Sequence, residues 1–260
     1  MPRFAANLSM LFTEVPFLER FERAAAAGFE AVEYLFPYDH EPADLRRLLD
    51  RHGLRQVLFN LPAGNWAAGD RGTAALSSRR EEFRAAVEAA IKYARALDCP
   101  RLHAMAGVTA AGADLEAAEA TFIENLRFAA DAAAADGITI LIEALNDRDV
   151  PGYFVAHQMD ALALVRKIDR PNVSVQLDYY HAQIMDGDLT HLTERLAGRF
   201  SHVQVASVPG RHEPDEGEVS YRHLFETLDR IGYTGWVGCE YVPRGETEAG
   251  LAWMRPYVEA

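Results

Sequence analysis

The chain has 260 residues, of which 49% are hydrophobic and 25% charged, a composition typical of one globular α/β domain. Its formal net charge of −13 argues against the broad basic surface that general nucleic-acid binding requires. No run approaches the ~18 apolar residues of a membrane span, and the first residues are not typical of a signal peptide, so we expect a cytoplasmic protein without a membrane partner. Two isolated cysteines, Cys99 and Cys239, predict neither a disulfide framework nor a thiolate metal site.

Short apolar runs alternate with amphipathic patterns along the whole chain, which is typical of parallel βα construction. The predicted strands, in chain order, cover residues 4–7, 31–34, 56–60, 101–105, 139–143, 173–178, 202–205 and 236–240. Apolar stripes at helical spacing lie between them, for example Phe83, Val87 and Ile91. These units predict a single-domain (β/α)8 barrel over residues 1–260.

A polar side chain lies at the end of almost every predicted strand, and this separates two architectures that parallel βα units can form. An open, doubly wound sheet would place such groups at one or two switch-point strands. Here the strand-end residues are Asn7, Glu33, Asn60, His103, Glu143, Asp178, Gln204 and Glu240. A ring of this kind favours the closed barrel, in which catalytic groups occupy the C-terminal strand ends.

The last four predicted strands each carry one oxygen donor: Glu143, Asp178, Gln204 and Glu240. Any one of these acids could simply cap the following helix or face solvent. Carboxylates that converge at a barrel mouth, however, repel one another unless they bind a cation or take up protons. Because carboxylates and an amide are hard donors, they predict a divalent metal ion, Mg2+ or Mn2+.

A metal ion beside two glutamates is typical of proton transfer next to a carbonyl group. The metal would act as a Lewis acid that stabilises a cis-enediolate, while one carboxylate removes a proton and the other returns it to the neighbouring carbon. Glu143 and Glu240 are the expected catalytic pair, because the side chain of Asp178 is shorter and Gln204 cannot titrate.

Arg211, in the segment after the seventh predicted strand, is the first candidate for binding an anionic substrate. An acidic protein needs a local cation for this purpose, and an arginine can hold a carboxylate through two parallel hydrogen bonds. The alternative is a local ion pair between Arg211 and Glu213 or Asp215.

Three further residues are candidates for substrate binding. His181 follows the sixth predicted strand and His103 lies in the fourth, where a packing role is the alternative for both. Arg71 lies in a glycine-containing loop over residues 61–72, which the composition predicts as either a lid or a rigid surface loop.

One known family resembles this chain in several segments, among them FAANLSMLFTEVPFLERF, FNLPAGNWAAGDRG, LIEALN, QLDYYHAQIMDGDLT, HVQVASVPGRHEPDEGEVSY and GYTGWVGCEYVPRGETEAGLAWM. They are similar, almost from end to end, to the hydroxypyruvate isomerase family, within the xylose-isomerase-like TIM barrels. The resemblance implies a divalent metal held by Glu143, Asp178, Gln204 and Glu240, with the two glutamates as acid and base. It also implies a small anionic 2-oxo acid or sugar acid as substrate, here hydroxypyruvate converted to tartronate semialdehyde. The sequence leaves the oligomeric state open, a homo-oligomer included.

Relatives of this family provide competing interpretations that the sequence leaves open. Some members isomerise other small oxo acids such as 2-oxotetronate. Ketose 3-epimerases resemble the chain but usually have His where Gln204 stands, and AP endonucleases use a His-rich zinc cluster with a DNA-binding surface that an acidic chain does not favour. A non-catalytic barrel that binds a metal or a sugar acid is the alternative of another class.

Overall fold

The computed structural model describes residues 2–258, and within them eight parallel strands close into a barrel. The strands are β1 (Arg3–Asn7), β2 (Ala31–Glu33), β3 (Arg55–Asn60), β4 (Arg101–His103), β5 (Thr139–Glu143), β6 (Val173–Asp178), β7 (Phe200–Val205) and β8 (Trp236–Cys239). Each strand pairs with the next along the chain, and β8 pairs with β1. The structure therefore confirms the predicted (β/α)8 barrel.

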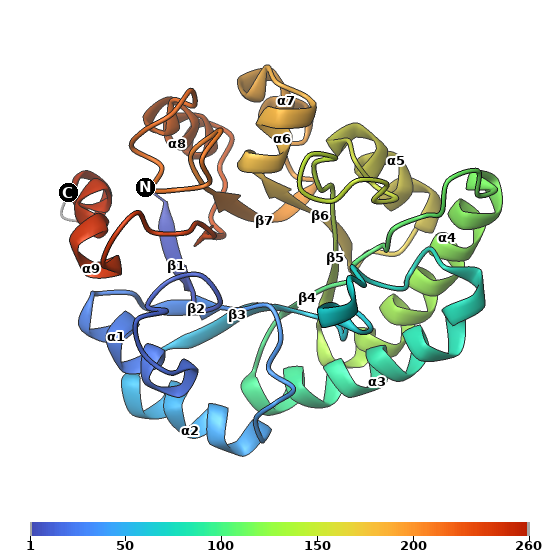
Figure 1. Cartoon of the computed structure of the whole chain (residues 1–260), viewed down its shortest axis with the longest axis horizontal. Helices are drawn as coiled ribbons and strands as arrows, with labels where there is room; N and C mark the ends of the chain where they lie inside the picture. The colour runs from blue at the N-terminus through green and yellow to red at the C-terminus, as the bar shows by residue number, and fades with distance from the viewer. Residues whose placement is uncertain (1, 259–260) are drawn as a thin grey trace.

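Helices surround the barrel, and the colour of the chain runs around this ring in sequence order (Figure 1). They are α1 (Arg20–Ala26), α2 (Pro42–His52), α3 (Arg80–Leu97), α4 (Leu115–Ala133), α5 (Gln158–Ile168), α6 (Tyr179–Met185), α7 (Leu189–Arg195), α8 (Tyr221–Arg230), α9 (Thr247–Gly250) and α10 (Arg255–Val258). The predicted stripe of α3 is buried in the same apolar cluster as Phe59 of β3 and Leu102 of β4. Burial of each large side chain in this layer contributes about 1.5–3 kcal/mol. Among the described residues, no helix has the length and apolar character needed to cross a membrane.

Strand alternation separates an apolar outer layer from a polar barrel interior. In β6, Val175 and Leu177 belong to the apolar cluster, whereas Gln176 and Asp178 lie on the opposite face of the strand. Residues of both faces are buried, because helices cover one and the barrel encloses the other. Polar side chains at alternate positions are thus carried inside the barrel.

Three predicted strands end one or two residues earlier in the structure, and the first of them, β2, ends at Glu33 instead of residue 34. β4 ends at His103, because the backbone carbonyls of Met105 and Ala106 leave the barrel ladder and accept hydrogen bonds from Ala74 and Ala75. β8 ends at Cys239, the last residue paired with both β1 and β7. Glu240 therefore follows its strand instead of closing it.

The loop over residues 61–72 is fixed to the barrel at its base. Gly72 pairs with Ala106 in an isolated antiparallel bridge, and its amide donates to the carbonyl oxygen of Ala63 at 3.0 Å. Gly72 has a positive φ of 105°, and a Cβ atom there would overlap the Met105 carbonyl, so only glycine fits. Whether the rest of the loop acts as a lid stays a prediction.

Candidate active site

A cavity of about 230 Å³ opens at the C-terminal ends of the strands. The ends of β1–β4 and the segments after them contribute Met10, Leu35, Asn60, Trp66, Arg71 and Met105 to its lining. The other half of the barrel contributes Glu143, Leu145, Asp149, Val150, Gln176, His181, Arg211 and Glu240. A mostly apolar side, which also carries Asn60 and Arg71, thus faces a side in which most residues are charged or polar.

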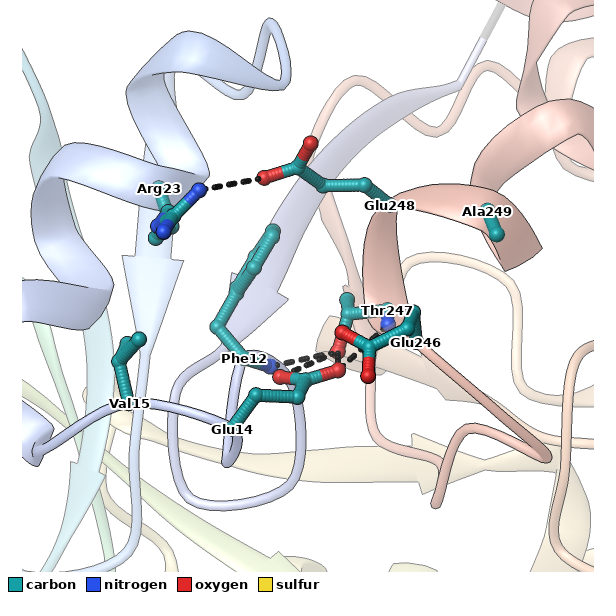
Figure 2. A pocket seen from close by; sticks show the side chains of 8 residues that line it. All are labelled: Phe12, Glu14, Val15, Arg23, Glu246, Thr247, Glu248 and Ala249. Carbon is teal, nitrogen blue, oxygen red and sulfur yellow. Dashed lines mark hydrogen bonds and ion pairs between the residues drawn. The ribbon is translucent and has the colours of Figure 1, made fainter.

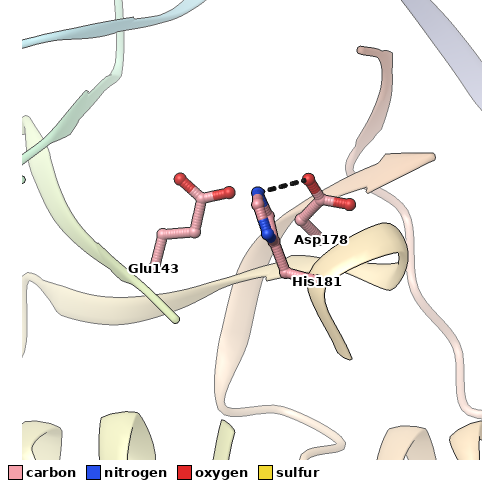
Figure 3. A group of neighbouring side chains, drawn as sticks. All are labelled: Glu143, Asp178 and His181. Carbon is pink, nitrogen blue, oxygen red and sulfur yellow. Dashed lines mark ion pairs between the residues drawn. The ribbon is translucent and has the colours of Figure 1, made fainter. Parts of the chain in front are cut away.

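Three of the predicted metal ligands lie close together here: Glu143 and Glu240 line the cavity, and Asp178 lies beside it, near Glu143 and Arg211. Glu143, Asp178 and Glu240 are each at most 6% exposed, and Figure 3 shows the Glu143 and Asp178 carboxylates turned toward the same space. Glu143 Oε1 and Asp178 Oδ2 are buried without a hydrogen-bond partner, as is Oε1 of the neighbouring Gln176. Buried oxygen atoms without partners are costly on their own, and they fit a hard divalent cation that prefers oxygen ligands.

Burial raises the pKa of all three acids. The pKa of Glu143 lies well above its ordinary value, first through burial and then through the negative charges of Glu240 and Asp178. Burial raises the pKa of Glu240 to about 8, although the positive charge of Arg211 opposes the rise. The same burial raises the pKa of Asp178, again against Arg211. In the metal-free protein, Glu240 is therefore mostly protonated at neutral pH, and Glu143 holds its proton more strongly than an exposed glutamate does.

We expect the affinity for Mn2+ to increase with pH. Below its pKa of about 8 the Glu240 carboxyl is mostly protonated, and a cation binds only the deprotonated form, so binding must release protons. Each displaced proton makes the affinity rise by up to about tenfold per pH unit below that pKa. Calorimetric titrations in buffers with different heats of ionisation measure the released protons directly. An affinity that does not change between about pH 6 and about pH 8 would contradict the assignment of these acids as ligands.

Gln204, the predicted fourth ligand, is buried but is not among the residues that line the cavity. Its Oε1 accepts a hydrogen bond from Gln176 Nε2 at 2.5 Å, and its Nε2 donates to Glu33 Oε1 at 2.8 Å. A carbonyl oxygen has two lone pairs, so Oε1 retains capacity for one further partner. Coordination by Gln204 remains a prediction.

His181 lines the cavity, and one of its nitrogen atoms faces Asp178 Oδ2 at 3.5 Å (Figure 3). The backbone amide of Asn146 donates to the other nitrogen, Nδ1, at 3.0 Å, so the ring proton must reside on Nε2. Burial, aided by the charge of Arg211, lowers the pKa of His181 well below its usual range and keeps the ring neutral. His181, Glu143 and Asp178 are close enough to share a metal ion. In this tautomer, however, Nε2 of His181 carries a proton and is a hydrogen-bond donor, which favours the predicted contact with substrate.

His103 lies beside Glu143 and outside the residues that line the cavity. Its Nδ1 is 3.3 Å from Glu143 Oε2, and burial lowers the pKa of the ring to about 3. A neutral His103 can orient the Glu143 carboxylate through this contact. In the structure, the partner of His103 is therefore Glu143. A direct contact between His103 and the substrate stays a prediction.

Arg211 reaches the centre of the acid group. Its Nη2 lies 2.8 Å from Glu240 Oε2 and 3.8 Å from Asp178 Oδ2, and its guanidinium stacks 4.7 Å from the centre of the Tyr180 ring. Although burial opposes its charge, Glu240 and Asp178 raise its pKa, so it stays protonated. A substrate carboxylate at the mouth could therefore meet this guanidinium.

The predicted alternative, a local ion pair of Arg211 with Glu213 or Asp215, is wrong. Both acids lie against Arg244, whose Nε is 3.0 Å from Glu213 Oε2 and whose Nη2 is 3.5 Å from Asp215 Oδ1. The backbone explains this choice, because the Arg211 amide donates to the Ser207 carbonyl and its own carbonyl accepts from Val242. These bonds hold residue 211 at a φ of 54° and direct its side chain inward.

Arg71 lines the outer part of the cavity. Its guanidinium lies 3.9 Å from the centre of the Trp66 ring, and its Nη1 donates to the backbone oxygen of Asp70 at 2.7 Å. Trp66, 37% exposed, contacts the ring of Phe36 edge to face. Arg71 and Trp66 together form the rim on the side of the loop over residues 61–72.

Several residues that sequence reasoning did not assign also take part. Gln176 lies two positions before Asp178, so strand alternation could have placed it on the same inner face. Tyr180 donates from its hydroxyl to Asp149 Oδ2 at 2.9 Å and carries the stacked Arg211. No spacing rule connects Asp149 with Tyr180, because they lie on segments after different strands.

A second hollow, of about 350 Å³, lies away from the acids, between the segment after β1 and α9 (Figure 2). Thr247 of α9 makes two hydrogen bonds there to the segment after β1. Its amide donates to Glu14 Oε1 at 2.6 Å, and its hydroxyl accepts from the Phe12 amide at 2.8 Å. Arg23 and Glu248 form an ion pair at 3.4 Å. These contacts connect the segment after β1 and α1 with α9 across the hollow.

Comparison with known proteins gives consistent relatives along the whole chain. Residues 21–257 match the model of the xylose isomerase-like TIM barrel family. The 2-oxo-tetronate isomerase of Pectobacterium atrosepticum is 54% identical, covering 100% of this chain and 99% of the relative, and the hydroxypyruvate isomerase of Escherichia coli is 47% identical, covering 99% and 100%. A crystal structure from Brucella melitensis, described as an AP endonuclease of family 2, superposes with a TM-score of 0.97 at 63% identity and covers 99% of both chains. The chain therefore belongs to the xylose isomerase-like TIM barrel family and, within it, to the isomerases.

Proposed function

We propose that this isomerase interconverts a small 2-oxo acid and its 3-oxo isomer, with the four-carbon acid 2-oxo-tetronate as its preferred substrate. The observation that carries the proposal is the meeting of three buried acids with one arginine: Glu143, Glu240 and Arg211 line a small cavity, and Asp178 lies 3.8 Å from Arg211 beside it. Acids with raised pKa values suit proton transfer, and a guanidinium suits a carboxylate.

The reaction moves a carbonyl group from C2 to C3, so one proton leaves C3 and one arrives at C2, while the hydroxyl proton on O3 passes to O2. Glu143 and Glu240 perform these transfers, one as base and the other as acid. Glu143 approaches from β5 and Glu240 from the end of β8, so the pair can serve both carbons. The N–H of His181 donates to a substrate oxygen, and Arg211 holds the carboxylate.

A divalent metal fits the acid group. Mg2+ or Mn2+, held by Glu143, Asp178, Glu240 and the amide oxygen of Gln204, would polarise the carbonyl and offset the negative charge that develops during proton transfer. The chain's own residues prepare the site for it, because Arg211, stacked on Tyr180, holds the Glu240 carboxylate at 2.8 Å.

The choice of substrate follows from the relatives. Resemblance alone led us to expect hydroxypyruvate, but the 2-oxo-tetronate isomerase is 54% identical and the hydroxypyruvate isomerase 47%. The two acids differ by one CH2OH group on C3. A cavity of about 230 Å³, with Asn60 as an amide in its wall, has room for that group.

We expect kcat/KM for 2-oxo-tetronate to exceed that for hydroxypyruvate by about tenfold or more, because one carbon unit in a fitted pocket contributes about 1–3 kcal/mol. Initial rates on both acids and on a neutral ketose, together with deuterium uptake from D2O at C2 or C3, measure this preference. A higher kcat/KM for hydroxypyruvate would show that the shorter acid is the preferred substrate. A preference for the ketose would favour a 3-epimerase, and no exchange with any of them would favour a non-catalytic barrel.

A further inference from the structure

Glu33, on β2, accepts three hydrogen bonds inside the barrel although it does not line the cavity. Gln204 Nε2 and Asn7 Nδ2 donate to its Oε1 at 2.8 and 3.0 Å. His202 Nε2 lies 2.6 Å from its Oε2, and the other nitrogen of that ring is buried without a partner. The four side chains come from β1, β2 and β7, so this network crosses the barrel interior.

The barrel provides space for this carboxylate by means of a glycine. A Cβ atom on Gly238 of β8 would overlap both carboxylate oxygens of Glu33. Gly238 also pairs in register with Gln204. The absent side chain thus leaves the volume in which Glu33 meets the Gln204 amide.

The network determines which end of the Gln204 amide faces Glu33. An ionised carboxylate only accepts hydrogen bonds, so it binds the NH2 end of an amide and leaves the oxygen on the other side. That oxygen accepts from Gln176, a residue of the cavity wall. A metal ligand must present its oxygen, so the orientation of Gln204 is important for binding.

We propose that Glu33 is a positioning residue, which fixes the Gln204 amide with its oxygen toward the metal site and so sets the affinity of that site. The inference rests on the proposed function through Gln204 as a metal ligand. Partners that orient a ligand typically contribute 10–100-fold to metal affinity.

The first test is Glu33→Gln, measured by the Mn2+ dissociation constant from electron paramagnetic resonance titration. The 2.6 Å contact of His202 Nε2 with a carboxylate oxygen needs the ring proton on Nε2, so this N–H takes the oxygen of the new amide. The NH2 of the new amide then faces Gln204, whose own amide must turn its NH2 toward the site. We expect Mn2+ binding to weaken about 10–100-fold.

A control variant and a double-mutant cycle separate orientation from loss of charge or fold. Glu213→Gln changes another buried glutamate, which contacts Arg244 instead, and should leave the Mn2+ constant unchanged. In a Gln204→Glu background either end of residue 204 presents oxygen, and the amide introduced at position 33 can donate to it, so Glu33→Gln should no longer weaken binding. An equal loss of affinity in both backgrounds would show that only the charge of Glu33 matters and would overturn the proposal.

Gly238→Ala provides a second route that keeps every charge. Its methyl group displaces the Glu33 carboxylate, so it should also weaken Mn2+ binding, even if Glu33→Gln does not fold. Wild-type affinity in a folded Glu33→Gln or Gly238→Ala protein overturns this inference alone. If the wild-type protein itself binds no Mn2+, the metal site under the proposed function fails, and the inference fails with it.

Discussion

Replacement of Glu143 or Glu240 by Gln is expected to lower kcat by about 100-fold or more, because a general acid or base typically contributes 10²–10⁴. The change keeps the size of each side chain, so the barrel should fold. Both carboxyls are buried and have raised pKa values, as proton-transfer groups require. Steady-state rates with Mn2+ at saturating concentration measure the effect.

Deuterium exchange distinguishes the two glutamates from each other. The variant that lacks the base should lose exchange at C3 of the 2-oxo acid, whereas the variant that lacks the acid should retain it and still fail to form product. Asp178→Asn serves as the control, since this acid is expected to bind metal without transferring protons. Near-normal turnover by either glutamine variant with Mn2+ bound would remove that glutamate from the mechanism.

Replacement of Arg211 by Ala is expected to raise KM for the 2-oxo acid by about 10–100-fold, the range for a lost charge-assisted hydrogen bond or pair of bonds. Arg211→Lys should recover only part of this loss, because an ammonium group lacks the planar fork of the guanidinium. Arg71→Ala provides the comparison, since Arg71 lines the same cavity at its rim. An unchanged KM in Arg211→Ala together with a raised KM in Arg71→Ala would move the carboxylate contact to the rim.

The same arginine variants should also change the pH profile. Burial raises the pKa of Glu240 to about 8, and the positive charge of Arg211 opposes this rise. Loss of Arg211 should therefore raise the pKa of Glu240 above that value. In the plot of kcat/KM against pH, the limb that reports ionisation of Glu240 then moves toward alkaline pH in Arg211→Ala. The Arg211→Lys variant restores the charge and should bring this limb most of the way back, even where KM stays high.

The ring of strand-end residues was predictable because strand alternation and βα spacing are local properties of the sequence. The depth at which each side chain meets the cavity was not. Gln204 is buried beside Glu33, 171 residues away, and His103 lies against Glu143 instead of lining the cavity, because the stagger of a closed barrel sets which inner residues are level with one another. Sequence proximity was also misleading for Arg211, whose near neighbours Glu213 and Asp215 bind Arg244.

The two halves of the barrel make different contributions to the cavity. The acids, His181 and Arg211 all come from β5–β8 and the segments that follow, whereas the opposite wall, from Met10 to Met105, comes from β1–β4 and the segments after them. A mutation among these wall residues can thus change the length or polarity of the molecule that fits without altering Glu143 or Glu240. Such a barrel can acquire new substrates through the wall residues of its first half, while the buried acids and the residues that contact them, such as Asn7 and His103, are inherited unchanged.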